Sequence, residues 1–243
     1  MMKTKGILLT IAAAAMSAAA AAQPAAGKFS IIPRVGVSLA RMSGEGSQIT
    51  YITGTAIGDV QNASNKAGFA GGVDVEYQAA QQLAFSIGAH YVQQGCKYGN
   101  VRSDFASGGT NVKHYVGVNN HTVQLHSVNV PLLVSYYVAP GLAVKTGVQI
   151  GVPVSAHEKY TMAEYTEQES GEVQMDGRSD INADLDRTMR KTDFAIPVGV
   201  SFEYMNVILD ARYNIGLSRV QKDPYGDSKN RVFMFTAAYR FVL

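Results

Sequence analysis

From residue 29 onward, hydrophobic and polar residues alternate with a period of two. In one segment, for example, Leu83, Phe85 and Ile87 alternate with Ala84 and Ser86. This alternation predicts β-strands with one apolar and one polar face. Eight such segments are found, at residues 29–39, 68–77, 83–91, 127–136, 142–154, 193–204, 207–217 and 233–243. Most of them are long enough to cross a bilayer as tilted strands, which takes roughly 9–11 residues.

The connections between these segments are alternately short and long. Segments two and three, four and five, and six and seven are joined near Ala80, at Pro140–Gly141 and at Met205–Asn206. The long connections are residues 40–66, 95–125, 156–192 and 219–230. Short turns at one end and long loops at the other are typical of bacterial outer-membrane barrels. The sequence therefore predicts an all-β fold, an eight-stranded antiparallel up-and-down transmembrane β-barrel.

The polar face of the segments has balanced charge. It carries four basic residues, Arg34, Lys145, Arg212 and Arg240, and four acidic residues, Asp74, Glu76, Glu203 and Asp210. His90 lies on the same face. A lumen of eight strands is just wide enough for side chains, and charges placed there must pair. We therefore predict a packed polar lumen network without an open pore.

Aromatic residues on the apolar face gather near both ends of the segments. Two aromatic girdles flanking an aliphatic band are a feature of membrane barrels. The prolines of the strands, Pro33, Pro131, Pro153 and Pro197, count against a regular ladder because proline cannot donate a hydrogen bond. The apolar phase also slips between Leu125 and Val128, which predicts a bulge at residues 126–127.

The N-terminal residues have the pattern of a secretory signal peptide. Lys3 and Lys5 precede an apolar, alanine-rich stretch, and Ala20 and Ala22 form an A-x-A site before Gln23. We predict cleavage between Ala22 and Gln23, a signal peptide at 1–22 and a barrel domain at 23–243. Removal of the two lysines lowers the formal charge from +2 to zero. A nucleic-acid partner is therefore not expected.

Three short motifs resemble the PorT-like outer-membrane β-barrel domain proteins. They are the strand 125–137 (LHSVNVPLLVSYY), the strand 211–217 (ARYNIGL) and the terminal residues 238–241 (AYRF). The resemblance covers about residues 28–243 and implies a small outer-membrane barrel. It also implies that assembly machinery reads the C-terminal strand, here Phe235, Tyr239, Phe241 and Leu243. The chain ends on Leu243 instead of the usual aromatic residue.

Few residues suggest chemistry. His90 with Asp74 or Glu76, and Ser86 nearby, could form a catalytic set, but a histidine held within the lumen network is the simpler interpretation. Asp180, Asn182, Asp184 and Asp186 have a spacing similar to a calcium loop, without its glycine and its bidentate glutamate. No cofactor, metal site or catalytic residue is predicted. Cys96 is the single cysteine, so no disulfide can form within the chain.

These observations predict a non-enzymatic outer-membrane protein with a structural or surface-interaction role. Two alternatives remain open: an accessory component of a secretion or envelope-biogenesis system, and a membrane-embedded lipid-modifying hydrolase. The expected partners are outer-membrane lipids, the barrel assembly machinery and a surface or secretion-system protein bound by the acidic loop 156–192. Both termini are expected in the periplasm, since an even strand number brings them to one side.

Overall fold

The computed structural model describes residues 24–44, 48–53, 56–105, 112–222 and 227–243, and the secondary structure of these residues is entirely β. Among them there is no helix long and apolar enough to cross a membrane. The barrel strands are β1 (Phe29–Ser43), β4 (Lys66–Ala80), β5 (Leu83–Lys97), β7 (Lys113–Ala139), β8 (Leu142–Glu167), β10 (Asp193–Tyr204), β11 (Val207–Gly216) and β12 (Lys229–Tyr239).

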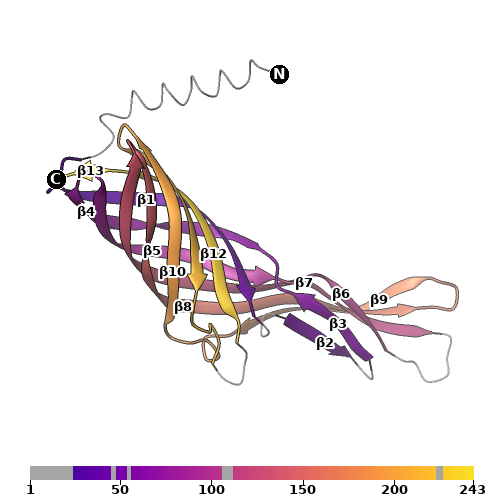
Figure 1. Ribbon diagram of the computed structural model, residues 1–243. Coiled ribbons are helices and arrows are strands. Elements are labelled where there is room, and N and C mark those ends of the chain that lie inside the picture. Colours follow the sequence, from indigo (N-terminus) through magenta and orange to yellow (C-terminus); the bar gives the residue numbers. More distant parts are fainter. Residues whose placement is uncertain (1–23, 45–47, 54–55, 106–111, 223–226) are drawn as a thin grey trace, which may run out of the picture.

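These eight strands close into a ring of antiparallel pairs. The order around the ring is β1, β4, β5, β7, β8, β10, β11, β12, and the β1–β12 pairing returns to the start. Figure 1 shows the resulting barrel, with its strands tilted against the barrel axis. Closure leaves no strand of the ring with a free edge, which a membrane requires because lipid cannot satisfy backbone polar groups. The predicted fold is confirmed.

The three short connections are tight turns at one end of the barrel. Gly141 and the pair Met205–Asn206 have positive φ angles of 74°, 48° and 67°. Two successive positive φ angles define a hairpin turn whose twist matches the twist of the flanking strands. The start of β1 and the C-terminal residue Leu243 lie at this end too, because the Leu243 N–H donates to the Phe29 carbonyl at 2.8 Å.

The faces of the barrel wall are inverted relative to a soluble protein. Outward side chains such as Val35, Ile87 and Val148 are 50–56% exposed, whereas the alternate positions are buried in the lumen. The girdle aromatics face outward in contacting pairs, as in Phe29–Tyr77 at the turn end, 4.8 Å between ring centroids. An apolar outside and a polar inside are stable only when lipid surrounds the barrel.

The irregularities predicted from the sequence are found in the β7–β8 pairing. The register shifts between His126 and Ser127, so the predicted bulge is confirmed. Pro153 lies opposite Ser127 at this shift. The other strand prolines are each paired on one side only, as residues without an N–H must be: Pro33 lies opposite Val73, Pro131 opposite Gln149 and Pro197 opposite Asn214, and all three are missing from the ladder with the other neighbouring strand.

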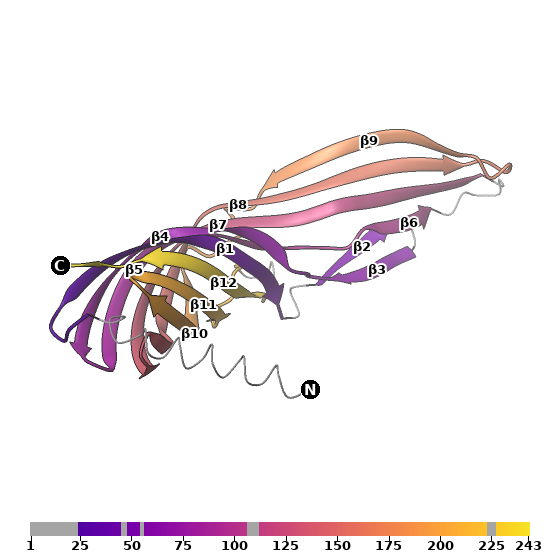
Figure 2. The same ribbon diagram turned by 90° about the horizontal axis from the view of Figure 1, so that it is seen from above.

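The predicted long loops are wrong in extent, because much of their length is strand. β7 and β8 have 27 and 26 residues and continue well past the bulge at residues 126–127. β8 then pairs with β9 (Val173–Asp184), and β7 pairs with β6 (Val101–Phe105). The segment 40–66 contains a hairpin of β2 (Gln48–Thr53) and β3 (Ala56–Asn62). Figure 2 shows β6 to β9 projecting together from the loop end of the barrel, and we call β6–β9 the projecting sheet.

The C-terminal strand also differs from the prediction. It begins at Lys229, earlier than expected, and it is interrupted at Arg240, after which β13 (Phe241–Val242) pairs with the start of β1. The Arg240 N–H donates to the Asn206 carbonyl instead of a ladder partner. The alternation of inward and outward side chains continues through the interruption, so the Arg240 side chain lies in the lumen, where it is 2% exposed.

Candidate functional site

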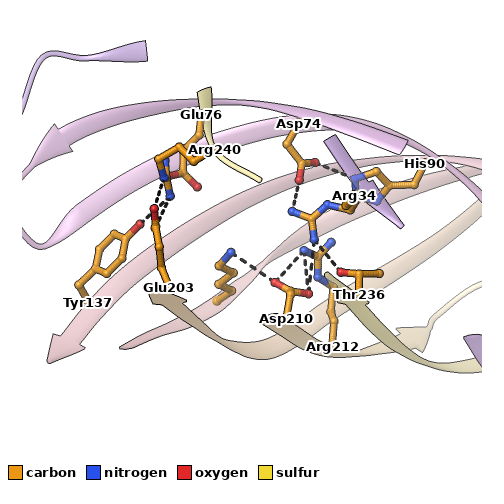
Figure 3. Close-up of polar contacts among 11 residues, drawn as sticks. Arg34, Asp74, Glu76, His90, Tyr137, Glu203, Asp210, Arg212, Thr236 and Arg240 are labelled. Atoms are coloured by element: carbon orange, nitrogen blue, oxygen red, sulfur yellow. Dashed lines mark hydrogen bonds and ion pairs between the residues drawn. The ribbon is translucent and has the colours of Figure 1, made fainter. Parts of the chain in front are cut away.

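The lumen holds two ion-pair clusters, which appear at the left and right of Figure 3. The cluster near the turns is centred on Arg240. Its guanidinium donates to both carboxylate oxygens of Glu203, at 2.7 and 2.9 Å, and to Glu76 at 2.7 Å. It also donates to the Tyr137 hydroxyl at 3.2 Å. Fork-like pairing of this kind fixes geometry as well as charge.

The second cluster joins six strands and is centred on two aspartates. Arg34 contacts Asp74 and donates to Thr236, and its other ion-pair partner is Asp210, at 3.6 Å. The Asp210 carboxylate also lies 3.3 Å from Lys145 Nζ and from Arg212 Nη2. Every charged side chain of this cluster is at most 6% exposed. Such buried charges are tolerable only because they are paired.

All the lumen residues named from the sequence therefore lie in these two clusters. The turn-side cluster has one cation against two carboxylates, and the second has three cations against two. The charges balance only when the clusters are taken together. Tyr137 and Thr236 complete the hydrogen bonding and were not anticipated, because a hydroxyl on an alternating strand gives no signal of its partner.

His90 is part of the second cluster. Its Nε2 lies 2.7 Å from Asp74 Oδ1, while the other oxygen of Asp74 contacts Arg34. The side chains of His90 and Asp74 are 1% and 2% exposed. Ser86 is two inward positions away along β5 and pairs in register with Glu76, not with the residues around His90. Because both side chains are almost completely buried and paired with each other, the geometry favours a structural histidine.

Above the charged lumen lies an apolar cap. It consists of Met42, Cys96, Tyr98, Val123, Leu125, Ala156, Met189 and Val220. The inward face of the strands thus changes from polar to apolar beyond the bulge, in segments that the sequence analysis assigned to loops. The alternation of Val123 and Leu125 with polar residues is the signal that could have identified these positions.

Two titratable side chains of the cap region have well-defined surroundings. The His121 side chain is 3% exposed, its Nε2 lies 2.6 Å from the Glu158 carboxylate, and its ring packs on Tyr98 and Tyr160. Cys96 is fully buried, and burial raises the pKa of its thiol to about 11. Neither residue faces solvent, so both serve the packing of the cap.

The acidic series in the third long connection does not form a metal site. Asp180, Asn182 and Asp184 occupy alternate positions of the extended strand β9, which spreads them over roughly 13 Å. Asp180 accepts from the Thr161 hydroxyl, and Asp186 accepts from the Ala156 N–H. Within the described ranges, no group of three potential ligands could hold a metal ion.

The remaining sequence-based sites lie at the chain ends. Phe235 and Tyr239 face outward on β12, Phe241 belongs to β13, and Leu243 bonds to Phe29. The cleavage site at residues 22–23 lies outside the described residues, so it stays a prediction.

Comparison with known proteins finds several similar solved structures. Solved structures similar to this chain include Ail, the attachment invasion locus protein of Yersinia pestis, at 15% identity and a TM-score of 0.40, covering 89% of this chain and 99% of that one. Neisserial surface protein A has 13% identity and a TM-score of 0.38, covering 87% and 95%. The outer membrane protease OmpT of Escherichia coli has 8% identity and a TM-score of 0.31, covering 89% and 97%. Among curated proteins, none matches.

The family model provides the decisive comparison. The model described as "Outer membrane protein beta-barrel domain" matches residues 21–221, most of the chain. The closed ring of eight strands, the outward apolar band and the buried lumen charges agree with that description. On this match and this architecture, the chain belongs to the outer membrane protein beta-barrel domain family.

Proposed function

We propose that the protein is a non-enzymatic outer-membrane barrel that binds a protein partner through its projecting sheet. The observation that carries the proposal is the length of β7, β8 and β9. About 14 residues of β7, from Lys113 to His126, continue beyond the lipid-facing band. At about 3.3 Å per residue, this length corresponds to roughly 45 Å of ordered sheet outside the membrane. Maintaining such a sheet is unnecessary for a purely structural barrel.

The edge strand β9 is the best-placed binding surface of this sheet. It pairs with β8 on one side and stands last in the strand order, so its other edge is unpaired within the described residues. An unpaired edge can accept a strand from a partner. β9 carries Asp176, Asp180 and Asp184 against Arg178, which favours a partner segment of net positive charge.

The lumen supports a role without catalysis or a channel. Its charged groups are buried and paired with one another, and the apolar cap lies above them. A lipid-modifying hydrolase would need a nucleophile or base open to substrate, and His90 is enclosed with Asp74. The proposal therefore assigns function to the outer surface instead of the lumen.

The proposal also requires that the two ends of the barrel face opposite sides of the membrane. We infer that the short turns and both termini face the periplasm and that the projecting sheet faces the medium, because barrels of this class have short periplasmic turns. An epitope tag at Gly171 should react with antibody on intact cells. A tag at Met205–Asn206 should react only after the outer membrane is opened. The reverse labelling would mean an inverted barrel.

Site-specific cross-linking tests the partner proposal. A photo-reactive amino acid replaces Ser179 on β9 in living cells, and the expected product is a discrete protein adduct. In a second variant, residues 161–180 are deleted and Tyr160 is joined to Ile181, its partner in register, by an Asn-Gly turn. This variant, probed from Asn182 in the part of β9 that remains, should lose the adduct that the same probe gives in the full-length protein.

The matched control replaces the β2–β3 hairpin by a turn and should keep the adduct. If β9 gives no protein adduct in any growth condition, the partner proposal is wrong. The identity of the cross-linked protein also tests a second candidate function. An envelope or secretion protein would indicate the accessory role that the PorT resemblance implies.

A further inference from the structure

Two arginines lie directly opposite each other on the lipid-facing side of the barrel. Arg41 of β1 and Arg231 of β12 are register partners, and the pair is followed by Leu39 and Phe233, which are 38% and 48% exposed. Like charges directly opposite on antiparallel strands are destabilising. The arrangement therefore needs an anion between the two guanidinium groups or a nearby carboxylate.

The described residues provide no such carboxylate. Arg231 donates to the Ser43 hydroxyl and to the Gly216 carbonyl, both at 3.2 Å. Neither arginine forms an ion pair with any acidic residue in the part of the chain that the structure describes. Residues 29–44 and 227–239 contain one acid, Asp227, which lies next to Gly44 beyond the arginine pair and has an interaction of its own. Lys229, two positions above Arg231, adds a third cation to this face.

The height of the pair corresponds to the lipid headgroups. Arg231 lies one outward position, about 7 Å, beyond Phe233. Phe233 packs on Tyr213 with ring centroids 4.3 Å apart, and both belong to the loop-end girdle. Girdle aromatics mark the boundary between acyl chains and headgroups. Arginine at this level meets phosphate oxygens, which its planar fork binds in bidentate fashion.

An apolar groove crosses the outer wall over β7, β8, β10, β11 and β12, and it reaches Phe233 next to the arginine pair. Its volume is about 540 Å³, and Phe233 and Tyr213 line it together with Val134, Val144, Val198, Val200 and Phe235. The groove exists because Ala211 is small among larger outward residues. A groove of this kind fits an acyl chain, and its lining begins two residues from Arg231.

We propose that Arg41 and Arg231 hold the phosphate of a membrane lipid whose acyl chain lies in the groove. The ligand class is an anionic phospholipid or phosphorylated glycolipid of the leaflet at the loop end. The proposal rests on the membrane embedding of the barrel, and the proposed sidedness decides only which leaflet supplies the lipid. It does not depend on the partner of β9, so either idea can fail alone.

Native mass spectrometry of the detergent-solubilised barrel tests the proposal with defined probes. Dimyristoyl phosphatidic acid should bind about tenfold more tightly than dimyristoyl phosphatidylcholine, as one or two charge-assisted contacts imply. The double variant Arg41→Gln/Arg231→Gln should bind the two lipids equally. The control Arg178→Gln removes an exposed arginine on β9 and should bind like the wild type. Equal binding of phosphatidic acid by the double variant and the wild type would overturn the proposal.

A second variant separates a lipid site from a free-anion site. Ala211→Phe fills the groove without touching the arginines, and it should weaken phosphatidic acid binding while leaving phosphatidylcholine binding low. If Ala211→Phe has no effect and inorganic phosphate alone displaces phosphatidic acid, the site binds a free anion and the lipid assignment is wrong. The side chains at positions 41, 211 and 231 all point outward, so these substitutions should leave the barrel folded. The electrophoretic mobility of unheated samples checks that each variant is folded.

Discussion

Gly88 of β5 lies against the carboxylate of Asp74 on β4, its partner in register. A Cβ atom on Gly88 would be 1.9 Å from Asp74 Oδ1 and 2.9 Å from His90 Nε2. The missing side chain thus leaves room for the most crowded part of the second lumen cluster. Since Asp74 is held by both Arg34 and His90, it cannot move aside freely.

Replacing Gly88 by alanine should therefore destabilise the barrel. We expect a loss of about 1–3 kcal/mol, the usual cost of overpacking a well-filled interior. Urea unfolding of the protein in phospholipid vesicles measures the change. Gly177→Ala on β9 is the matched control, because its Cβ would come no closer than 4.0 Å to another group. Equal stability of the two variants would mean that the lumen cluster can rearrange.

Arg240 should be the most sensitive single residue of the lumen. Arg240→Met leaves Glu76 and Glu203 buried without their cation, which should cost about 3–5 kcal/mol. Adding Glu76→Gln and Glu203→Gln removes the unpaired charges and should recover part of the loss. The exposed pair of Lys113 and Glu167 provides the comparison, and Lys113→Ala should change stability by less than about 1 kcal/mol. The same unfolding assay measures all of these variants.

Cys96 should be unreactive in the folded protein. The pKa of its thiol is raised to about 11 by burial, and only the thiolate attacks maleimide or disulfide reagents. At pH 8 the native protein should show no labelling, and one thiol should appear in denaturant. Ser179→Cys in a Cys96→Ala background should label readily, since position 179 is exposed. Rapid native labelling of Cys96 would contradict the closed cap.

The same thiol predicts a pH dependence of stability. The folded state keeps a proton that the unfolded chain releases at its ordinary pKa of about 9. The contribution of Cys96 to stability is therefore complete below pH 9 and is lost as the pH rises toward 11. The unfolding free energies of wild type and Cys96→Ala should differ less at pH 10.5 than at pH 8. A difference that does not depend on pH would indicate a solvated thiol.

Barrel and strand positions could be predicted from the sequence because side-chain alternation is a local property. Each strand must present apolar groups to lipid at every second position, so eight segments and the bulge at residues 126–127 are visible without any knowledge of contacts. The turns at Pro140–Gly141 and Met205–Asn206 are local for the same reason. The balance of charge on the inward face likewise predicted a packed lumen.

The partners of each lumen charge were decided only by tertiary structure. Arg240 meets Glu203 and Glu76 across 37 and 164 residues of chain, and this choice depends on how the strands are staggered when the ring closes. The projecting sheet and the facing pair Arg41–Arg231 were not predictable for a related reason. The strands of the projecting sheet need no strict alternation of apolar and polar residues, because cross-strand pairing and the apolar cap stabilise them. The Arg41–Arg231 pair depends on the register between two strands that are distant in the sequence, and neither strand alone encodes that register.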